Sequence, residues 1–232
     1  MKMTDGAVWR TVRVLYYPEK ELCMESYRTV MLETHAEFTE KRSKFIGYIK
    51  PVQTREQADA FIQEIKTKHW DATHNVYAYV LRKGQIQRYS DDGEPQGTAG
   101  IPVLEVLRKA GLTDAAVVVT RYFGGVLLGG GGLVRAYSHA AALAVDSAGV
   151  LQMLQCKIAR VRCDYTRYGK IAALIAACRG AVDDTVFADA VQIAFHMPLA
   201  DFGGFVKQLS EMSCGEICAE SLGEDFFAVS DF

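Results

Sequence analysis

Residues Ser90–Leu133 read SDDGEPQGTAGIPVLEVLRKAGLTDAAVVVTRYFGGVLLGGGGL, and this stretch contains the features that decide the fold. Ala115–Thr120 (AAVVVT) is apolar and β-branched, which predicts a strand covered on both faces. Apolar residues at helical spacing predict a helix over Leu133–Ala148. Each glycine inside a regular element costs roughly 0.5–1 kcal/mol relative to alanine. We therefore expect Gly129–Gly132 to form a loop at the helix N-terminus, where free N–H groups attract anions.

The composition is that of an ordinary globular protein. The chain has 232 residues, of which 50% are hydrophobic and 23% charged, with a formal net charge of −2. This length allows two small domains, and the charge gives no overall attraction to nucleic acid. The six cysteines lack zinc-site spacing, which predicts reduced thiols. No apolar run approaches a membrane span and no signal pattern is present, so we expect a cytoplasmic protein.

The pattern on both sides of this stretch predicts two α+β domains. Residues 1–23 are expected to be a loosely held extension, although Val8–Tyr17 could add an edge strand. The next part should hold strands over Tyr27–Phe38, Lys44–Val52, His74–Leu81 and Gln85–Tyr89, and helices over Arg55–His69 and Pro102–Lys109.

From Leu151 onward the pattern restarts, and its order is β-α-β-β-α-β, the split βαβ or ferredoxin-like unit. The predicted strands are Gln155–Asp164, Val182–Ala188, Val191–Met197 and Glu216–Leu222, and the predicted helices are Tyr168–Cys178 and Phe202–Met212.

An acidic turn precedes the buried strand. Its residues Asp91, Asp92 and Glu94 have two interpretations: a divalent cation site, or a turn in which aspartates accept local N–H bonds and Glu94 pairs with Arg121. No further ligand pattern converges on this turn, so we expect a structural turn and no metal.

Two neighbours of this turn are also expected to be structural. Thr98 should form a capping or local hydrogen bond. His74 should be a structural or cleft-lining histidine, because no nucleophile occupies a recognisable elbow.

Basic and aromatic residues flank the glycine loop. Arginine beside tyrosine suits single-stranded RNA, with charge for phosphate and a ring for the base. The alternative is an ion-pair cluster with the acidic turn. The loop itself either holds phosphate or is a tight turn, and no Walker sequence follows it. The predicted RNA- or phosphate-binding residues are Arg121, Tyr122, Gly124, Gly125, Gly130, Gly131, Gly132, Arg135 and Tyr137.

Three segments together resemble the YigZ/IMPACT family: DATHNVYAY (Asp71–Tyr79), DDGEPQGTAG (Asp91–Gly100) and RYFGGVLLGGGGLVRAY (Arg121–Tyr137). The resemblance runs from about Met24 to the C-terminus. It implies an α+β protein in which residues 24–150 are similar to the second domain of ribosomal protein S5. Residues 151–232 should be ferredoxin-like, similar to the last domain, domain V, of elongation factor G.

The resemblance also implies a role in translation. We expect a regulatory protein whose N-terminal domain binds RNA, the ribosome or a translation factor, without a cofactor or a membrane. The alternative is a phosphate-handling enzyme that uses the glycine loop and the acidic turn.

Overall fold

The computed structural model describes residues 26–229, and the predicted extension 1–23 with its edge strand lies outside them. The described chain divides into two compact units, Tyr27–Leu151 and the residues from Gln152 onward. This boundary falls inside strand β7 (Val150–Cys163). None of the helices in the described range is long and apolar enough to cross a membrane.

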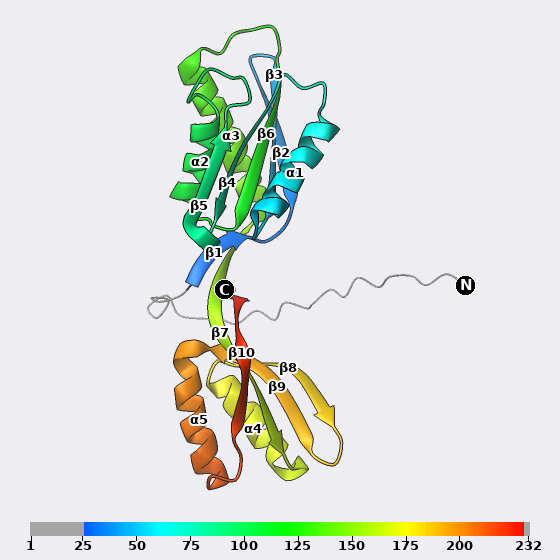
Figure 1. The fold of residues 1–232 in the computed structure, drawn as a ribbon, viewed down its shortest axis with the longest axis vertical. Coiled ribbons are helices and arrows are strands. Elements are labelled where there is room, and N and C mark those ends of the chain that lie inside the picture. Colours follow the sequence, from blue (N-terminus) through cyan, green and yellow to red (C-terminus); the bar gives the residue numbers. More distant parts are fainter. Residues whose placement is uncertain (1–25, 230–232) are drawn as a thin grey trace, which may run out of the picture. The chain divides into compact units, whose positions relative to one another are not determined.

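The N-terminal unit is built on an antiparallel sheet (Figure 1). Its central strand is β6 (Ala115–Tyr122), in which Ala115–Thr120 are buried as the apolar sequence predicted, and Arg121 is buried as well. The strand order is β2 (Thr34–Glu40), β3 (Ser43–Pro51), β6, β4 (His74–Leu81) and β5 (Ile86–Ser90). A 3₁₀ turn, η2 (Lys83–Gln85), joins β4 to β5.

Helices cover both faces of this sheet (Figure 1). Helix α1 (Arg55–Lys68) packs on one face, where Phe61 contributes to a core with Tyr48 and Val118. Helices α2 (Gly100–Lys109) and α3 (Gly130–Ala148) cover the other face. α3 comes so close to β3 that a Cβ on Gly47 would lie 2.4 Å from the Ala140 carbonyl oxygen.

Two predictions for the N-terminal unit are wrong. The strand expected over Tyr27–Phe38 is divided into β1 (Ser26–Val30) and β2, because the chain bends at residues 31–33 and the Met31 amide donates to the Gly149 carbonyl. Helix α3 begins at Gly130 rather than Leu133, after Gly129 with a φ of 73°. The expected glycine loop is therefore partly the first helical turn, whose amides have no intrahelical acceptors.

The C-terminal unit has the predicted β-α-β-β-α-β order. Its elements are β7, α4 (Tyr165–Ala177), β8 (Ala181–Phe187), β9 (Val191–Pro198), α5 (Leu199–Ser213) and β10 (Ala219–Val229). Strand β7 pairs antiparallel with β9 and β10, and β8 pairs with β9. Phe195, Phe205, Ile171 and Ile175 fill the core between this sheet and the two helices.

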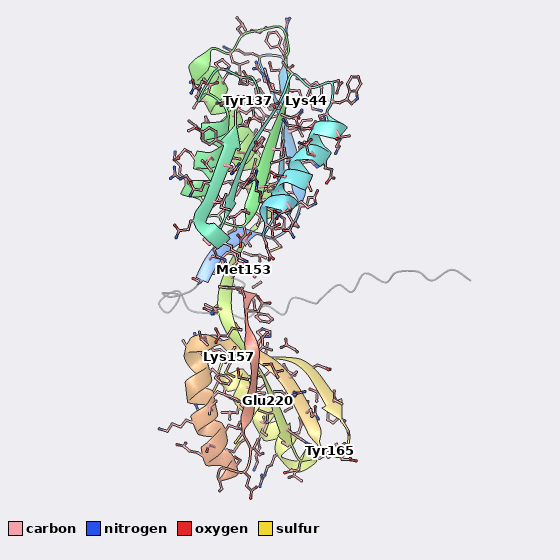
Figure 2. The ribbon with its side chains drawn as sticks, in the orientation of Figure 1. Lys44, Tyr137, Met153, Lys157, Tyr165 and Glu220 are labelled. Atoms are coloured by element: carbon pink, nitrogen blue, oxygen red, sulfur yellow. The ribbon has the colours of Figure 1, made fainter. Side chains whose placement is uncertain are left out.

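The last strand extends seven residues beyond the predicted end at Leu222. Charged residues interrupt its apolar pattern, but Glu224 lies opposite Lys157 of β7 and forms an ion pair of 2.9 Å with it. Lys157 and Glu220 both belong to this strand pair (Figure 2). The cysteines Cys156, Cys163, Cys178, Cys214 and Cys218 are free thiols, as expected.

Candidate functional site

The register of the N-terminal sheet brings four connections to one end. Lys44 pairs with Tyr122, Arg121 with His74, and Tyr77 with Ser90. The β2–β3 turn (residues 41–42), the α1–β4 loop (69–73), the acidic turn (91–99) and the β6–α3 loop (123–129) therefore lie together (Figure 1). We call this region the loop end. Lys44 and Tyr137 mark it in Figure 2.

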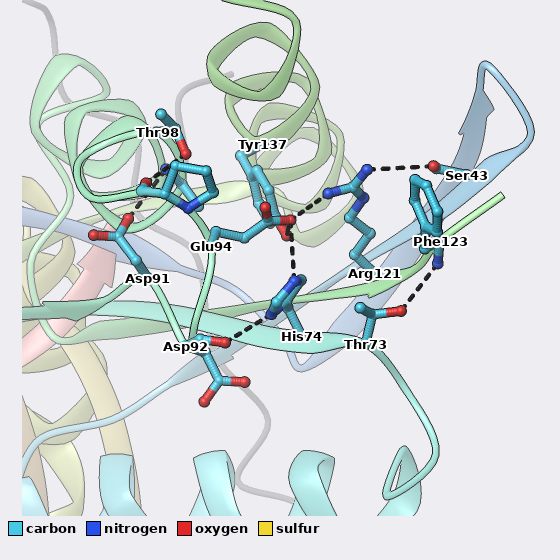
Figure 3. A network of polar contacts seen from close by, with 12 residues as sticks. Ser43, Thr73, His74, Asp91, Asp92, Glu94, Thr98, Arg121, Phe123 and Tyr137 are labelled. Atoms are coloured by element: carbon cyan, nitrogen blue, oxygen red, sulfur yellow. Dashed lines mark hydrogen bonds and ion pairs between the residues drawn. The ribbon is translucent and has the colours of Figure 1, made fainter. Parts of the chain in front are cut away.

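Glu94 is the centre of a buried polar network at the loop end (Figure 3). Its Oε1 accepts hydrogen bonds from Arg121 Nη1 at 2.5 Å and from Tyr137 Oη at 2.8 Å. Burial and the Glu94 carboxylate raise the pKa of Tyr137 far above its usual range, so Tyr137 stays protonated and donates. The ion pair between the acidic turn and Arg121, one of the two alternatives for these residues, is the arrangement found.

Two of the predicted RNA- or phosphate-binding residues, Arg121 and Tyr137, are buried and are not accessible to a ligand at the surface. Arg121 is 5% exposed and Tyr137 is completely buried. Arg121 lies on the face of β6 that α3 covers. The Glu94 carboxylate offsets the charge of Arg121 there, so the guanidinium stays charged although it is buried.

The Arg121 side chain also connects the glycine loop to the β2–β3 turn. Its Nη2 lies 3.5 Å from Ser43 Oγ, which accepts the Gly124 N–H at 3.2 Å. A Cβ at position 124 would lie 2.0 Å from the Arg42 carbonyl carbon, so only glycine fits there. The Arg121 guanidinium lies 5.5 Å from the Phe123 ring centroid, and its buried Nε has no hydrogen-bond partner among the described atoms.

The other carboxylates of the acidic turn accept hydrogen bonds from the protein. Asp91 accepts the amides of Gly97, Ala99 and Gly100 at 2.9, 3.1 and 2.8 Å and so caps α2. Asp92 accepts from Lys66 Nζ and the Asn75 amide, both at 2.7 Å. The Asp91 contacts are the local N–H bonds that the structural interpretation predicted, whereas Asp92 accepts from residues 26 and 17 positions away along the chain. Between residues 26 and 229, no group of three His, Cys, Asp or Glu side chains is arranged to hold a metal ion.

Thr98 and His74 have the structural contacts that we expected. Thr98 Oγ1 donates to the Pro95 carbonyl at 2.6 Å. His74 Nδ1 lies 2.7 Å from the Asp92 carbonyl, and since a carbonyl only accepts, Nδ1 carries the proton. His74 Nε2 is 3.8 Å from Glu94 Oε1, so the histidine lies between two residues of the turn.

A second chain of hydrogen bonds, which the sequence did not reveal, runs from Tyr48 through His69 and Tyr122 to Asp71. Tyr122 Oη donates to Asp71 at 3.0 Å, and it must therefore accept from His69 Nδ1–H at 2.9 Å. His69 Nε2 is then the acceptor for Tyr48 Oη at 2.7 Å. Burial lowers the pKa of His69, and burial together with Asp71 raises that of Tyr122. Tyr122, predicted to contact RNA, thus has its hydroxyl engaged internally.

The side chains that remain accessible at the loop end include apolar and cationic groups, beside the exposed polar residues Glu40, Asp71 and Gln96. Trp70 is 84% exposed, Leu127 81% and Phe123 46%. Lys41, Arg42 and Arg135 are exposed, and no carboxylate of the described chain forms an ion pair with them. We call the following set the loop surface: Lys41, Arg42, Trp70, Phe123, Leu127, Gly130, Gly131 and Arg135.

The sequence predicted only part of the loop surface. It identified Arg135 and the glycines, and a Cβ at Gly131 would meet no atom within 4 Å, so packing does not require glycine there. It missed Lys41, Arg42 and Trp70 because they come from separate connections of the sheet. Their common property, exposure beside the glycine loop, is not visible along the chain.

Comparison with known proteins assigns both parts of the chain. Residues 41–145 match the Impact N-terminal domain, and residues 161–216 match a Domain of unknown function (DUF1949). A solved structure described as "Crystal structure of an hypothetical protein" has a TM-score of 0.56 and 30% identity, covering 86% of this chain and 98% of that one.

Two bacterial curated relatives share most of their length with the chain, and one from Dictyostelium discoideum shares a smaller part. IMPACT family member YvyE of Bacillus subtilis is 38% identical over 194 residues, which are 83% of this chain and 89% of that protein. IMPACT family member YigZ of Escherichia coli is 33% identical over 180 residues, 76% of this chain and 88% of that protein. The Protein IMPACT homolog of Dictyostelium discoideum is 39% identical over 106 residues, 44% of this chain and 29% of that protein. The resemblance predicted from three motifs is thus confirmed, and the chain belongs to the IMPACT family as a bacterial two-domain member homologous to YigZ and YvyE.

Proposed function

We propose that this chain is a cytoplasmic, translation-associated regulatory protein that binds RNA, on or near the ribosome, through the loop surface of its N-terminal unit. One observation supports the proposal above all others. The exposed cations Lys41, Arg42 and Arg135 have no ion-pair partner in the described chain and lie at the same end of the sheet as exposed Trp70 and Phe123. Cations neutralise phosphates and aromatic rings stack on bases, which are the two requirements for holding single-stranded RNA.

The architecture adds support by analogy. We take the N-terminal unit to be similar to the second domain of ribosomal protein S5. We take the C-terminal unit, with strand order β10-β7-β9-β8, to be ferredoxin-like and similar to the last domain of elongation factor G. Both named proteins belong to the translation machinery, although a fold by itself does not determine function.

The proposed contact residues differ from those that the sequence suggested. Arg121 is neutralised by Glu94, and a phosphate could reach it only by breaking a buried ion pair. Lys41 and Arg42 therefore replace it as phosphate contacts beside Arg135, which the sequence had already suggested.

The alternative, a phosphate-handling enzyme, would need carboxylates that are free to hold a metal ion. Asp91, Asp92 and Glu94 all accept hydrogen bonds from protein donors, which favours binding over catalysis.

The test is co-sedimentation with ribosomes over a series of salt concentrations. Arg42→Ala combined with Arg135→Ala should weaken binding and lower the salt slope by up to about 2, because each cation neutralises about one phosphate. Trp70→Ala should weaken binding without changing the slope, because it removes stacking and no charge. A charge-matched control, Lys83→Ala with Lys109→Ala, alters two exposed cations at the other end of the unit and should bind like the wild type.

Three results would contradict the proposal. The wild type could remain in the supernatant at low salt, or the two double variants could pellet equally. Purified ribosomal RNA could also fail to compete for the protein, which would assign the contact to a ribosomal protein or a translation factor.

A further inference from the structure

A hollow of about 280 Å³ lies between the β2–β3 hairpin and the first half of α3. Phe38, Glu40 and Lys41 line it from the hairpin, and Leu128, Arg135 and His139 line it from the glycine loop and helix. Its volume is close to the lower limit of about 300 Å³ for sites that bind small organic molecules. It can therefore hold at most one small ligand or one terminal residue of a polymer.

Positive charge dominates the polar part of the hollow. Lys41 and Arg135 carry permanent charges, whereas Glu40 is the one carboxylate among the lining residues. The turn that presents Lys41 holds it at a φ of 45° and Arg42 at 65°, a left-handed conformation that hairpins of this length usually assign to Asn-Gly. The lysine side chain thus extends from a defined two-residue turn rather than from a long loop.

The rest of the wall is apolar and well supported. The Phe38 ring packs against Phe45 with centroids 5.2 Å apart, and the His139 ring meets it edge-on at 4.7 Å. Leu128 lies against the same core. A flat apolar wall beside two cations is suited to a ligand that carries an anionic group at one end and a ring at the other.

We propose that this hollow binds an organic phosphate of the nucleotide class, with the phosphate on Lys41 and Arg135 and the ring against Phe38 and Leu128. Two kinds of ligand carry a phosphate and a base in this way: a free nucleoside monophosphate and the 5′-phosphorylated end of an RNA chain. Arginine can hold two phosphate oxygens at once and lysine adds a point charge. Lys41 and Arg135 belong both to this hollow and to the loop surface, so for the end of an RNA chain the inference deepens the proposed function and rests on it. Binding of a free nucleotide does not depend on the proposed function.

The experiment titrates AMP, adenosine and inorganic phosphate separately into the full chain and follows binding by calorimetry and by amide shifts in α3. AMP should bind at least about tenfold more tightly than adenosine or phosphate, the factor expected from one charge-assisted hydrogen bond. Lys41→Ala and Arg135→Ala should each weaken AMP binding about tenfold for the same reason and leave adenosine unchanged. Lys83→Ala, a cation at the other end of the unit, should have no effect on AMP.

Glu40→Gln provides a test in the opposite direction. Removing this carboxylate should strengthen AMP binding and leave adenosine binding unaltered, because only the charged ligand is repelled by it. A trinucleotide RNA with a 5′-phosphate, compared with the same RNA carrying a 5′-hydroxyl, distinguishes the polymer end from the free nucleotide. Binding of either phosphorylated probe supports the site.

The inference is overturned if neither phosphorylated probe binds at millimolar concentration, if adenosine binds as well as AMP, or if the Lys41 and Arg135 variants bind AMP like the wild type. Its failure is separate from failure of the proposed function. A protein that pellets with ribosomes in a salt-dependent way but ignores AMP would refute the hollow alone. A protein that binds AMP but never pellets would refute the ribosome contact alone.

Discussion

Replacing Arg121 with methionine tests whether the Glu94 network holds the N-terminal unit together. The substitution keeps an unbranched side chain but removes the charge, and it leaves the Glu94 carboxylate, whose side chain is 4% exposed, with Tyr137 as its remaining close donor. Removing one partner of a buried ion pair costs about 3–5 kcal/mol. A whole domain is stabilised by only about 5–15 kcal/mol, so this loss should bring the N-terminal unit close to unfolding.

Hydrogen exchange of the β6 amides, measured by NMR at increasing urea concentration, reports the free energy of opening this unit. Val117, Val118 and Val119 are suitable probes because they are completely buried in the central strand. Amides of β9 serve as an internal control, since they belong to the C-terminal core and should stay protected. Arg135→Met, at an exposed position of α3, should change β6 protection by no more than about 0.5 kcal/mol.

The double variant Arg121→Met with Glu94→Gln examines the coupling. Glutamine retains an oxygen that can accept from Tyr137, and no uncompensated charge remains. The double variant should therefore lose less stability than the sum of its two single variants, by at least about 1 kcal/mol. A loss below about 1 kcal/mol for Arg121→Met would refute the reasoning, because a broken buried ion pair costs more. Strict additivity in the double variant would refute it as well.

Three further predictions follow from the same structure. Folding lowers the pKa of His69, so the unfolded chain takes up a proton at a higher pH than the folded chain does. The stability that neutral His69 contributes is therefore present above pH about 6.5 and falls as the pH drops below it. Urea unfolding between pH 5 and 8 should show a shallower pH dependence for His69→Gln than for the wild type. Gly124→Ala should lower the free energy of unfolding by about 1–3 kcal/mol, because the new Cβ would overlap the Arg42 carbonyl. Gly131→Ala, in open space within a helix, should be neutral or stabilising by up to about 1 kcal/mol. Equal melting temperatures for the two variants would contradict this prediction. A fragment that begins at Gln152 should unfold cooperatively and give dispersed amide resonances, and absence of both would place the boundary elsewhere.

Local patterns predicted the elements of both units well, and the failures have identifiable causes. The run Ala115–Thr120 is apolar on both faces and is buried on both faces. The helix expected from Leu133 begins at Gly130, because glycine propensity is a weak effect in a first turn where other contacts position the chain. Strand β10 was predicted too short, because Glu224 becomes a compatible strand residue only when Lys157 lies opposite it.

The candidate site was predicted less completely than the fold. The acidic turn and its pairing with Arg121 were among the alternatives, because opposite charges near a buried strand must compensate one another. Which face of β6 Arg121 would occupy, and whether it would be exposed, could not be derived from neighbouring residues. Lys41, Arg42 and Trp70 carried no motif of their own.

The sequence by itself determined the type and order of the elements and the family, because repeats of 3.6 and 2.0 residues and short motifs are properties of neighbouring residues. Only the tertiary structure decided which charges are buried and which remain accessible. Arg121 is buried because a carboxylate 27 residues away neutralises it, and Arg135 remains exposed because no carboxylate of the described chain pairs with it. A buried charge loses its hydration and needs an oppositely charged partner to offset that loss. The antiparallel register, not the distance along the chain, brings this partner within reach.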